Sequence, residues 1–227
     1  MVGCPGSGKG TLSARIERHF GVPIITAGDL LRSHIRQGTP LGHAASASIR
    51  AGRLMPDATM MELVGAKLHT MQHDDWILDG FPRTLGQAQL LSAELARTQC
   101  PLSLVVQLHV PESVILQRIL ERWTHVPSGR VYNLSFNPPR TPGLDDVTGE
   151  PLEQREDDNP APFQRRLAGH HAQTEPMVEF FRTQTSPHGA PLVVDLEGRT
   201  SDEIWPQLQR VLIERGASLS TRTPCGP

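Results

Sequence analysis

Apolar residues recur every third or fourth position over much of the chain, a spacing typical of helices that bury one face. It predicts helices over residues 11–20, 29–36, 44–50, 57–71, 85–95, 111–120, 161–181 and 201–212. Short apolar runs predict buried strands over residues 76–78, 102–110 and 192–194. Asp57 and Ser201 are expected to cap their helices, and Pro111 suits a first helical turn. Strands that alternate with helices indicate an α/β protein with a doubly wound parallel sheet, which binds ligands at the carboxyl ends of its strands.

Residues 121 to about 160 interrupt this alternation, because they are rich in Pro, Gly, Asn and Asp and have no helical period. Val131–Tyr132 and Leu134–Phe136 within them resemble short strands. We therefore expect a small inserted β-rich subdomain. The tail over residues 217–227 is expected to be disordered.

Composition and charge exclude some partners. The formal net charge of −2 creates no global field for nucleic acid or an anionic membrane. The apolar runs are too short to span a membrane. The 3 cysteines are an odd number and widely spaced, which favours free thiols in a reducing compartment. Arginine far outnumbers lysine, so a single Arg is weak evidence of function, whereas Lys9 in a glycine-rich stretch is stronger evidence.

The chain opens MVGCPGSGKGT, and this stretch fits a phosphate loop. Glycines let backbone N–H groups turn inward around a phosphate, and the helix that follows adds its positive N-terminal end. Lys9 would reach the outer phosphates, and the Thr11 hydroxyl would lie near Mg²⁺. A chance glycine-rich turn is the alternative. The residues predicted to hold a triphosphate are Gly6, Ser7, Gly8, Lys9, Gly10 and Thr11.

Five motifs together resemble the adenylate kinase family, in the order expected for it. They are residues 3–11, Thr26–Arg32, Asp79–Thr84 with Gln87, residues 128–132 with 136–139, and Arg155–Asp158. The resemblance covers nearly the whole chain to about residue 215. It implies a nucleoside monophosphate kinase that moves the γ-phosphoryl group of a nucleoside triphosphate reversibly to AMP. The expected fold is a three-layer phosphate-loop core over residues 1–25, 56–120 and 160–216, with an AMP-binding insert over 26–55 and a lid over 121–159.

The chemistry agrees with this resemblance. The acceptor phosphate is already anionic, so the reaction needs positioning and positive charge more than a strong base. Guanidinium groups remain charged and bind phosphate oxygens in a fork. The resemblance assigns phosphoryl transfer to Lys9, Arg83, Arg118, Arg122, Arg155 and Arg166, and the triphosphate also to Arg122, Val131, Tyr132 and Ser201. It assigns AMP to Ala27, Arg32, Arg53, Leu54, Met55, Gly80, Phe81, Pro82, Arg83, Gln87, Arg155 and Arg166.

Asp79 ends a predicted strand, and we expect it to order Mg²⁺ through water molecules, together with Thr11. A purely structural cap is the alternative. Ala27 departs from the family pattern, which usually has Thr or Ser there in contact with AMP. Loss of that hydroxyl should weaken one polar contact, so we expect a higher KM for AMP and relaxed base selectivity.

His125, Ser128, Asp145 and Thr148 have the spacing of a four-cysteine zinc ribbon. Some members of the family bind zinc at these positions. Ser and Thr hydroxyls are poor zinc ligands, so the sequence predicts a hydrogen-bonded cluster that stabilises the lid without zinc.

Residues 122–125 and 204–206 resemble the mitochondrial subgroup of the family that uses GTP. GTP or ITP is therefore the expected donor, with ATP as the alternative, and the products are ADP and a nucleoside diphosphate such as GDP. A mitochondrial matrix location follows from this resemblance alone, with the cytoplasm as the alternative, and we expect a monomer. Another phosphate-loop enzyme is a less favoured hypothesis.

Only Met1 and Val2 precede the phosphate loop, where such loops usually follow a buried strand. We therefore expect a truncated first strand. Its loss would remove main-chain hydrogen bonds from neighbouring strands. The chain is then either a shortened form of a working kinase or a destabilised nucleotide-binding form with impaired catalysis.

Overall fold

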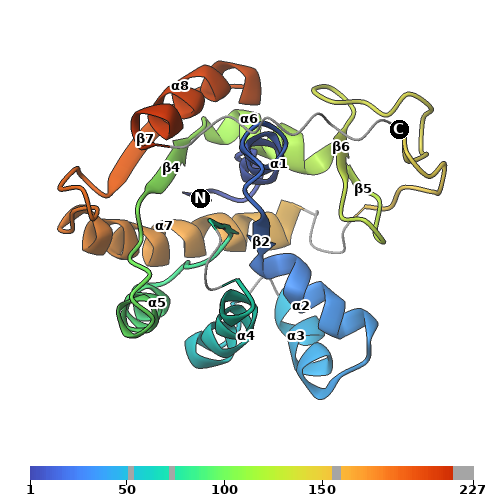
Figure 1. The fold of residues 1–227 in the computed structure, drawn as a ribbon. Helices are drawn as coiled ribbons and strands as arrows, with labels where there is room; N and C mark the ends of the chain where they lie inside the picture. Colours follow the sequence, from blue (N-terminus) through green and yellow to red (C-terminus); the bar gives the residue numbers. More distant parts are fainter. Residues whose placement is uncertain (51–53, 72–74, 155–159, 217–227) are drawn as a thin grey trace.

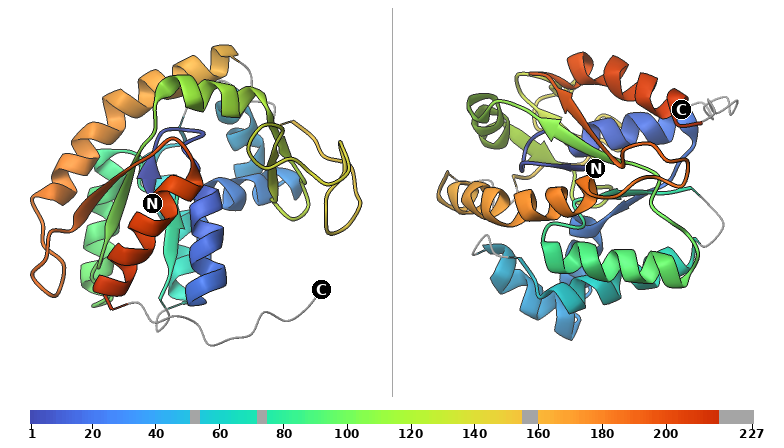
Figure 2. Two further views of the ribbon diagram at one scale, coloured as in Figure 1. Left: turned by 90° about the horizontal axis from the view of Figure 1, so that it is seen from above. Right: turned by 90° about the vertical axis from the view of Figure 1, so that its left-hand side faces the viewer.

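The protein is a three-layer α/β structure, with parallel strands between two layers of helices (Figures 1 and 2). The computed structural model describes residues 1–50, 54–71, 75–154 and 160–216. In chain order the elements are β1 (Val2–Gly3), α1 (Lys9–Phe20), β2 (Ile24–Thr26), α2 (Ala27–Arg36), α3 (Pro40–Arg50), α4 (Asp57–His69), β3 (Ile77–Asp79), α5 (Leu85–Arg97), β4 (Val105–His109), α6 (Glu112–Leu120), β5 (Arg122–Thr124), β6 (Val131–Asn133), α7 (Pro160–Arg182), β7 (Val193–Glu197) and α8 (Ser201–Glu214).

All pairings within the core are parallel, as the alternation of strands and helices predicts. Strand β4 pairs with β1 on one side and with β7 on the other, with Gln107 opposite Val2 and opposite Asp195. Strands β2 and β3 form a second parallel pair. Strands β5 and β6 pair in antiparallel fashion outside the core.

Strand β1 has only 2 residues, Val2 and Gly3. Among the described residues, the core strands therefore form two separate ladders, β1–β4–β7 and β2–β3. One hydrogen bond joins them where β1 borders β3, because the Met1 nitrogen donates to the carbonyl of Leu78 at 2.9 Å. The short strand thus lies in the middle of the sheet but pairs along one edge only.

Each face of the sheet has its own apolar core. Helices α1 and α8 cover one face, with Leu12 and Ile204 packed against Leu108. Helices α5 and α7 cover the other, with Met177 packed near Val105. Helices α2, α3 and α4 surround the β2–β3 pair and share a third core with α5. In Figure 1 these three helices lie below the core, and the β5–β6 hairpin lies at the upper right.

Two expected helix caps are wrong by one residue. Helix α4 begins at Asp57 itself, after Pro56, and no side chain caps it. The cap of α8 is Thr200 and not Ser201, because the Thr200 hydroxyl accepts a hydrogen bond from the Glu203 N–H at 3.2 Å. Thr200 and Ser201 are both residues of capping type, and local packing selects between them. Pro111 likewise stands just before α6, as its cap residue.

Leu134–Phe136 is a turn and not a strand. The side-chain oxygen of Asn133 accepts hydrogen bonds from the N–H groups of Ser135 and Phe136, at 3.1 and 3.0 Å. This side chain-to-backbone turn competes with strand pairing. The sequence pattern also missed β2, whose 3 residues are too few to show a period.

None of the described helices has a segment that is both long and apolar enough to span a membrane. The expected tail over residues 217–227 lies outside the described residues.

Adding about four to six apolar residues before Val2 is expected to raise both Tm and kcat, because a strand of usual length could pair with β3 as well as β4. Thermal unfolding and steady-state kinetics of the two forms measure the effect. A Gly/Ser extension of equal length is the matched control, since it adds chain without β propensity or apolar surface. Equal Tm and kcat values for all three forms would show that pairing of β1 with β3 is needed for neither stability nor catalysis.

Candidate active site

The loop between β1 and α1 folds as a phosphate loop should. Gly6 and Gly8 have φ angles of 83° and 91°, in the left-handed region that favours glycine. A Cβ on Gly6 would also lie 3.0 Å from the side chains of Ile115 and Ile119. No side chain caps the first turn of α1, so its backbone N–H groups are available to an anion at this helix end.

Lys9 folds back over the loop that carries it. Its Nζ donates hydrogen bonds to the carbonyls of Gly3 and Cys4, at 2.7 and 2.8 Å. These carbonyls orient the ammonium group at the start of α1. The same loop therefore supplies both the N–H groups and the cation that a triphosphate requires.

Asp79 is 7% exposed and lies at the carboxyl end of β3, beside the start of α1. An ideal Cβ on Gly10 would lie 3.5 Å from its Oδ2 atom, and the exposed Thr11 follows. A carboxylate and a hydroxyl are oxygen donors of the kind that Mg²⁺ prefers. The described residues contain no group of three or more His, Cys, Asp or Glu side chains that could hold a metal ion. Asp79 and Thr11 fit a Mg²⁺ ion that also takes phosphate and water ligands.

Arg118 reaches the phosphate loop from α6. Its Nη2 donates to the carbonyl of Arg199 at 2.7 Å, and its guanidinium lies 5.0 Å from the centre of the Phe136 ring. Burial lowers the pKa of this guanidinium, against a smaller opposing effect of Glu203, but an arginine remains charged. An ideal Cβ on Gly8 would lie 3.4 Å from the Arg118 Nη1 atom and 3.0 Å from the Ser201 hydroxyl. Arg118 and Ser201 therefore both lie beside the loop.

The loop after β3 holds Arg83 by its backbone and its side chain. The Arg83 N–H donates to Oε1 of Gln87 at 2.8 Å, and its Nε donates to the Gly80 carbonyl at 2.7 Å. Gln87 is 2% exposed and lies on α5, whose cap is Thr84. Gln87 was assigned to the AMP base by resemblance, and here its side chain supports the Arg83 backbone. Phe81 and Pro82, which belong to this loop, are buried.

His170 on α7 borders the same site, although the sequence predicts no role for it. Its pKa is lowered to about 4, mainly by burial and also by the positive charges of Lys9, His171 and Arg83. The phosphate loop and the Arg83 loop thus act on one imidazole. The feature of the sequence that could have indicated His170 is its position one helical turn after Arg166.

Four further residues assigned to AMP, Ala27, Arg32, Leu54 and Met55, lie on α2 or near it. Arg32 forms an ion pair with Asp29 on the same helix. Ala27 and Met55 are 1% and 8% exposed and belong to one apolar core, with Leu54 before Met55 half-buried. Arg53 and Arg155 lie outside the described residues, as does the side chain of Arg166.

The lid lies close to the AMP-binding insert, and it also carries three residues assigned to the donor. An ideal Cβ on Gly129 of the lid would lie 3.7 Å from the Asp29 carboxylate of α2. Arg122 and Val131 lie on the β5–β6 hairpin, where Val131 is 42% exposed. The side chain of Tyr132 points into the lid, where its hydroxyl donates to Asp145 at 2.9 Å.

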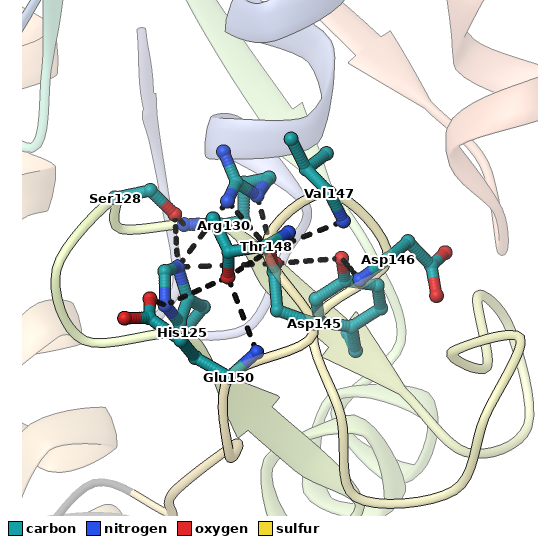
Figure 3. A network of polar contacts seen from close by, with 9 residues as sticks. His125, Ser128, Arg130, Asp145, Asp146, Val147, Thr148 and Glu150 are labelled. Carbon is teal, nitrogen blue, oxygen red and sulfur yellow. Dashed lines mark hydrogen bonds and ion pairs between the residues drawn. The ribbon is translucent and has the colours of Figure 1, made fainter.

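Asp145 is the centre of a polar network in the lid (Figure 3). It is 2% exposed and accepts two hydrogen bonds from Arg130, at 2.8 and 2.6 Å. It also accepts bonds from the N–H and the hydroxyl of Thr148, at 2.8 and 2.9 Å. The Arg130 guanidinium holds the pKa of the Asp145 carboxyl far below its usual range, against the opposing effect of burial, and hydrogen bonds from Thr148 and Tyr132 lower it further.

His125, which directly follows β5, completes this network. Its Nδ1 is 2.7 Å from the Ser128 hydroxyl, and its Nε2 is 2.6 Å from Glu150 (Figure 3). The four residues with zinc-ribbon spacing thus lie in one cluster, joined by Arg130 and Glu150. The sequence pattern did not indicate these two, because neither stands at a ribbon position.

Taken together, this geometry is that of a phosphate-loop protein that binds nucleotides. The chain belongs to the adenylate kinase family, whose model, described as "Adenylate kinase", matches residues 1–186. It is 40% identical over 220 residues to a protein of Saccharomyces cerevisiae named "GTP:AMP phosphotransferase, mitochondrial", covering 95% of this chain and 92% of that one. It is 41% identical over 215 residues to a protein of the same name from Drosophila melanogaster, covering 95% and 94%.

Replacing Asp145 by Asn is expected to loosen the lid, because an amide nitrogen would face the Arg130, Tyr132 and Thr148 donors. Amide hydrogen exchange over residues 121–154 should become faster, while exchange in α1 and β4 is unchanged. Asp146→Asn is the matched control, since Asp146 is exposed and its Oδ1 accepts one bond, from the Arg140 N–H at 2.7 Å. Equal protection of the lid in both variants would contradict a central role for Asp145.

The lid should also respond to acid. Because the pKa of Asp145 is depressed in the folded state, its stabilising effect is complete above the unfolded value of about 3.9 and decreases as the pH falls below it. Lid protection should therefore decrease below about pH 4 in the unsubstituted protein. Asp145→Asn should lose most of this pH dependence, whereas Asp146→Asn should retain it.

Proposed function

We propose that the protein is a GTP:AMP phosphotransferase that moves the γ-phosphoryl group of GTP reversibly to AMP, giving GDP and ADP. One observation carries the proposal: a single cavity is lined by Cys4 of the phosphate loop and by Thr174, whose hydroxyl bonds the carbonyl of Arg83 in the loop after β3. A loop expected to bind the donor and a loop expected to bind the acceptor thus border one site. The names of the relatives support GTP as donor and AMP as acceptor.

The proposed mechanism is positioning combined with electrostatic stabilisation. The loop N–H groups and Lys9 hold the triphosphate, and Arg83 with Arg32 holds the AMP phosphate, in line with the terminal phosphorus. Arg118, Arg122, Arg155 and Arg166 are proposed to stabilise the charge that spreads over the transferring group. Mg²⁺, held through Thr11, Asp79, water and the phosphates, would neutralise part of the donor's charge. Closure of the lid and of the AMP-binding insert would exclude water and so suppress hydrolysis.

The names of the relatives also support a mitochondrial location. ATP or ITP as donor remains a second candidate, because Val131 and Ser201, which are proposed to border the donor base, do not distinguish these bases. A nucleotide-binding form with impaired catalysis is a third, because β1 contributes only 2 residues to the sheet.

Consumption of AMP, one molecule per turnover with any donor, should be fastest with GTP, and faster than with ATP at equal concentration. Chromatographic separation of nucleotides measures this directly, with GTP, ITP and ATP compared at saturating AMP and Mg²⁺. Lys9→Met should abolish transfer with each donor, and Lys67→Met, on α4, is the matched control that should leave it unchanged. Faster transfer from ATP than from GTP would identify ATP as the donor. Tight nucleotide binding without ADP formation would favour the nucleotide-binding form with impaired catalysis.

Ala27→Thr is expected to lower the KM for AMP about threefold to tenfold, because one hydroxyl hydrogen bond contributes roughly 0.5–1.5 kcal/mol. Ala27 is 1% exposed, so the added atoms could also disturb packing. Ala27→Val is the matched control, since valine has nearly the shape of threonine but no hydroxyl. An equal KM in the unsubstituted protein and the Thr variant would contradict the prediction.

A further inference from the structure

Thr174 joins the long helix α7 to the loop that carries Arg83. Its hydroxyl donates a hydrogen bond to the Arg83 carbonyl at 3.3 Å, across 91 positions of the sequence. Thr174 is 4% exposed and lies in the middle of α7. No motif in the sequence includes it.

A threonine suits this contact. Its branched Cβ restricts χ1, so the hydroxyl has few directions available. Within a helix that hydroxyl commonly bonds a carbonyl of the preceding turn, and here it bonds a different segment. Threonine is also a poorer helix former than the residues with unbranched side chains, so propensity does not account for its presence.

The contact completes the support of Arg83 on both sides of its Cα atom. Gln87 on α5 accepts from the Arg83 N–H, and Thr174 on α7 donates to the Arg83 carbonyl. The guanidinium Nε is held at the Gly80 carbonyl. Two helices of the same layer thus fix the backbone from which the guanidinium extends.

The face of α7 that carries Thr174 also borders the site. His170 precedes Thr174 by one helical turn, and both line a cavity of about 660 Å³ beside Cys4 of the phosphate loop. The effects of Lys9 and Arg83 on the His170 pKa agree with this placement. Thr174 therefore lies on the functional face of α7.

We propose that Thr174 is a positioning residue for the acceptor nucleotide, which acts through the Arg83 backbone and not by contact with substrate. The proposal rests on the proposed function, in which Arg83 binds the phosphate of AMP. A guanidinium binds phosphate through a planar fork, so its affinity depends on orientation. Loss of the Thr174 hydroxyl should therefore weaken binding of AMP more than binding of the triphosphate.

Thr174→Val removes the hydroxyl and keeps the shape. We expect the KM for AMP to rise about fivefold, while the KM for GTP stays within about twofold of the unsubstituted value. Thr183→Val is the matched control, because the exposed Thr183 follows the same helix and its hydroxyl bonds the nearby Phe180 carbonyl at 2.9 Å. Equal increases in both KM values, or no increase, would overturn the proposal.

Thr174→Ser and Thr174→Ala keep the test valid if the valine variant does not fold. They differ from each other only in the hydroxyl. The serine variant should have a KM for AMP close to that of the unsubstituted protein, and the alanine variant a raised one. Equal KM values in this pair would overturn the proposal.

A double-mutant cycle tests whether Thr174 acts through Arg83. Calorimetric titration with AMP gives Kd for the unsubstituted protein, Thr174→Val, Arg83→Ala and the double variant. Thr174→Val should weaken binding about fivefold when Arg83 is present and by less than about twofold when it is absent. An equal loss in both backgrounds would assign Thr174 to general stability and overturn the positioning role. Failure of the unsubstituted protein to bind and phosphorylate AMP would instead overturn the proposed function together with this one.

Discussion

The pairing of β1 with β4 is the constraint on which the candidate site depends. The phosphate loop leaves β1 after Gly3 and enters α1 at Lys9, so its shape is set by how firmly these two ends are held. Strand β4 holds the first end, and the burial of Leu12 and Ile16 holds the second. Because the loop is fixed before a ligand binds, little free energy is needed to orient its N–H groups. The 2-residue length of β1 therefore concerns function as well as stability.

Main-chain carbonyls orient the cations around this loop. Lys9 donates to Gly3 and Cys4, Arg83 donates to Gly80, and Arg118 donates to Arg199. A neutral carbonyl fixes the direction of a cation while leaving its charge, which suits a site that must gather two anionic nucleotides. In the lid, Arg130 pairs with the buried Asp145, and there the pair stabilises the structure of the lid itself.

The sequence indicates candidate residues for the site, but not the contacts that hold them in place. The motifs predicted Lys9, Asp79 and Arg83 and the turn to which each belongs, because the chemistry requires these residue types at short fixed spacings. The cap of α8 at Thr200, the start of α4 at Asp57, the turn after Asn133 and the short β2 were not predicted by the pattern. Thr200 and Ser201 have similar capping preference, so packing selects between them.

The sequence by itself determined the alternation of helices and strands, the phosphate loop and the cluster of polar residues in the lid, because each depends on local periodicity or on residue type at a fixed spacing. Only the tertiary structure decided that α7 presents His170 and Thr174 to the Arg83 loop, and that Met1 bonds to Leu78. These contacts join residues far apart in the sequence. Their partners are selected by the packing of helices on the sheet, which leaves no local pattern along the chain.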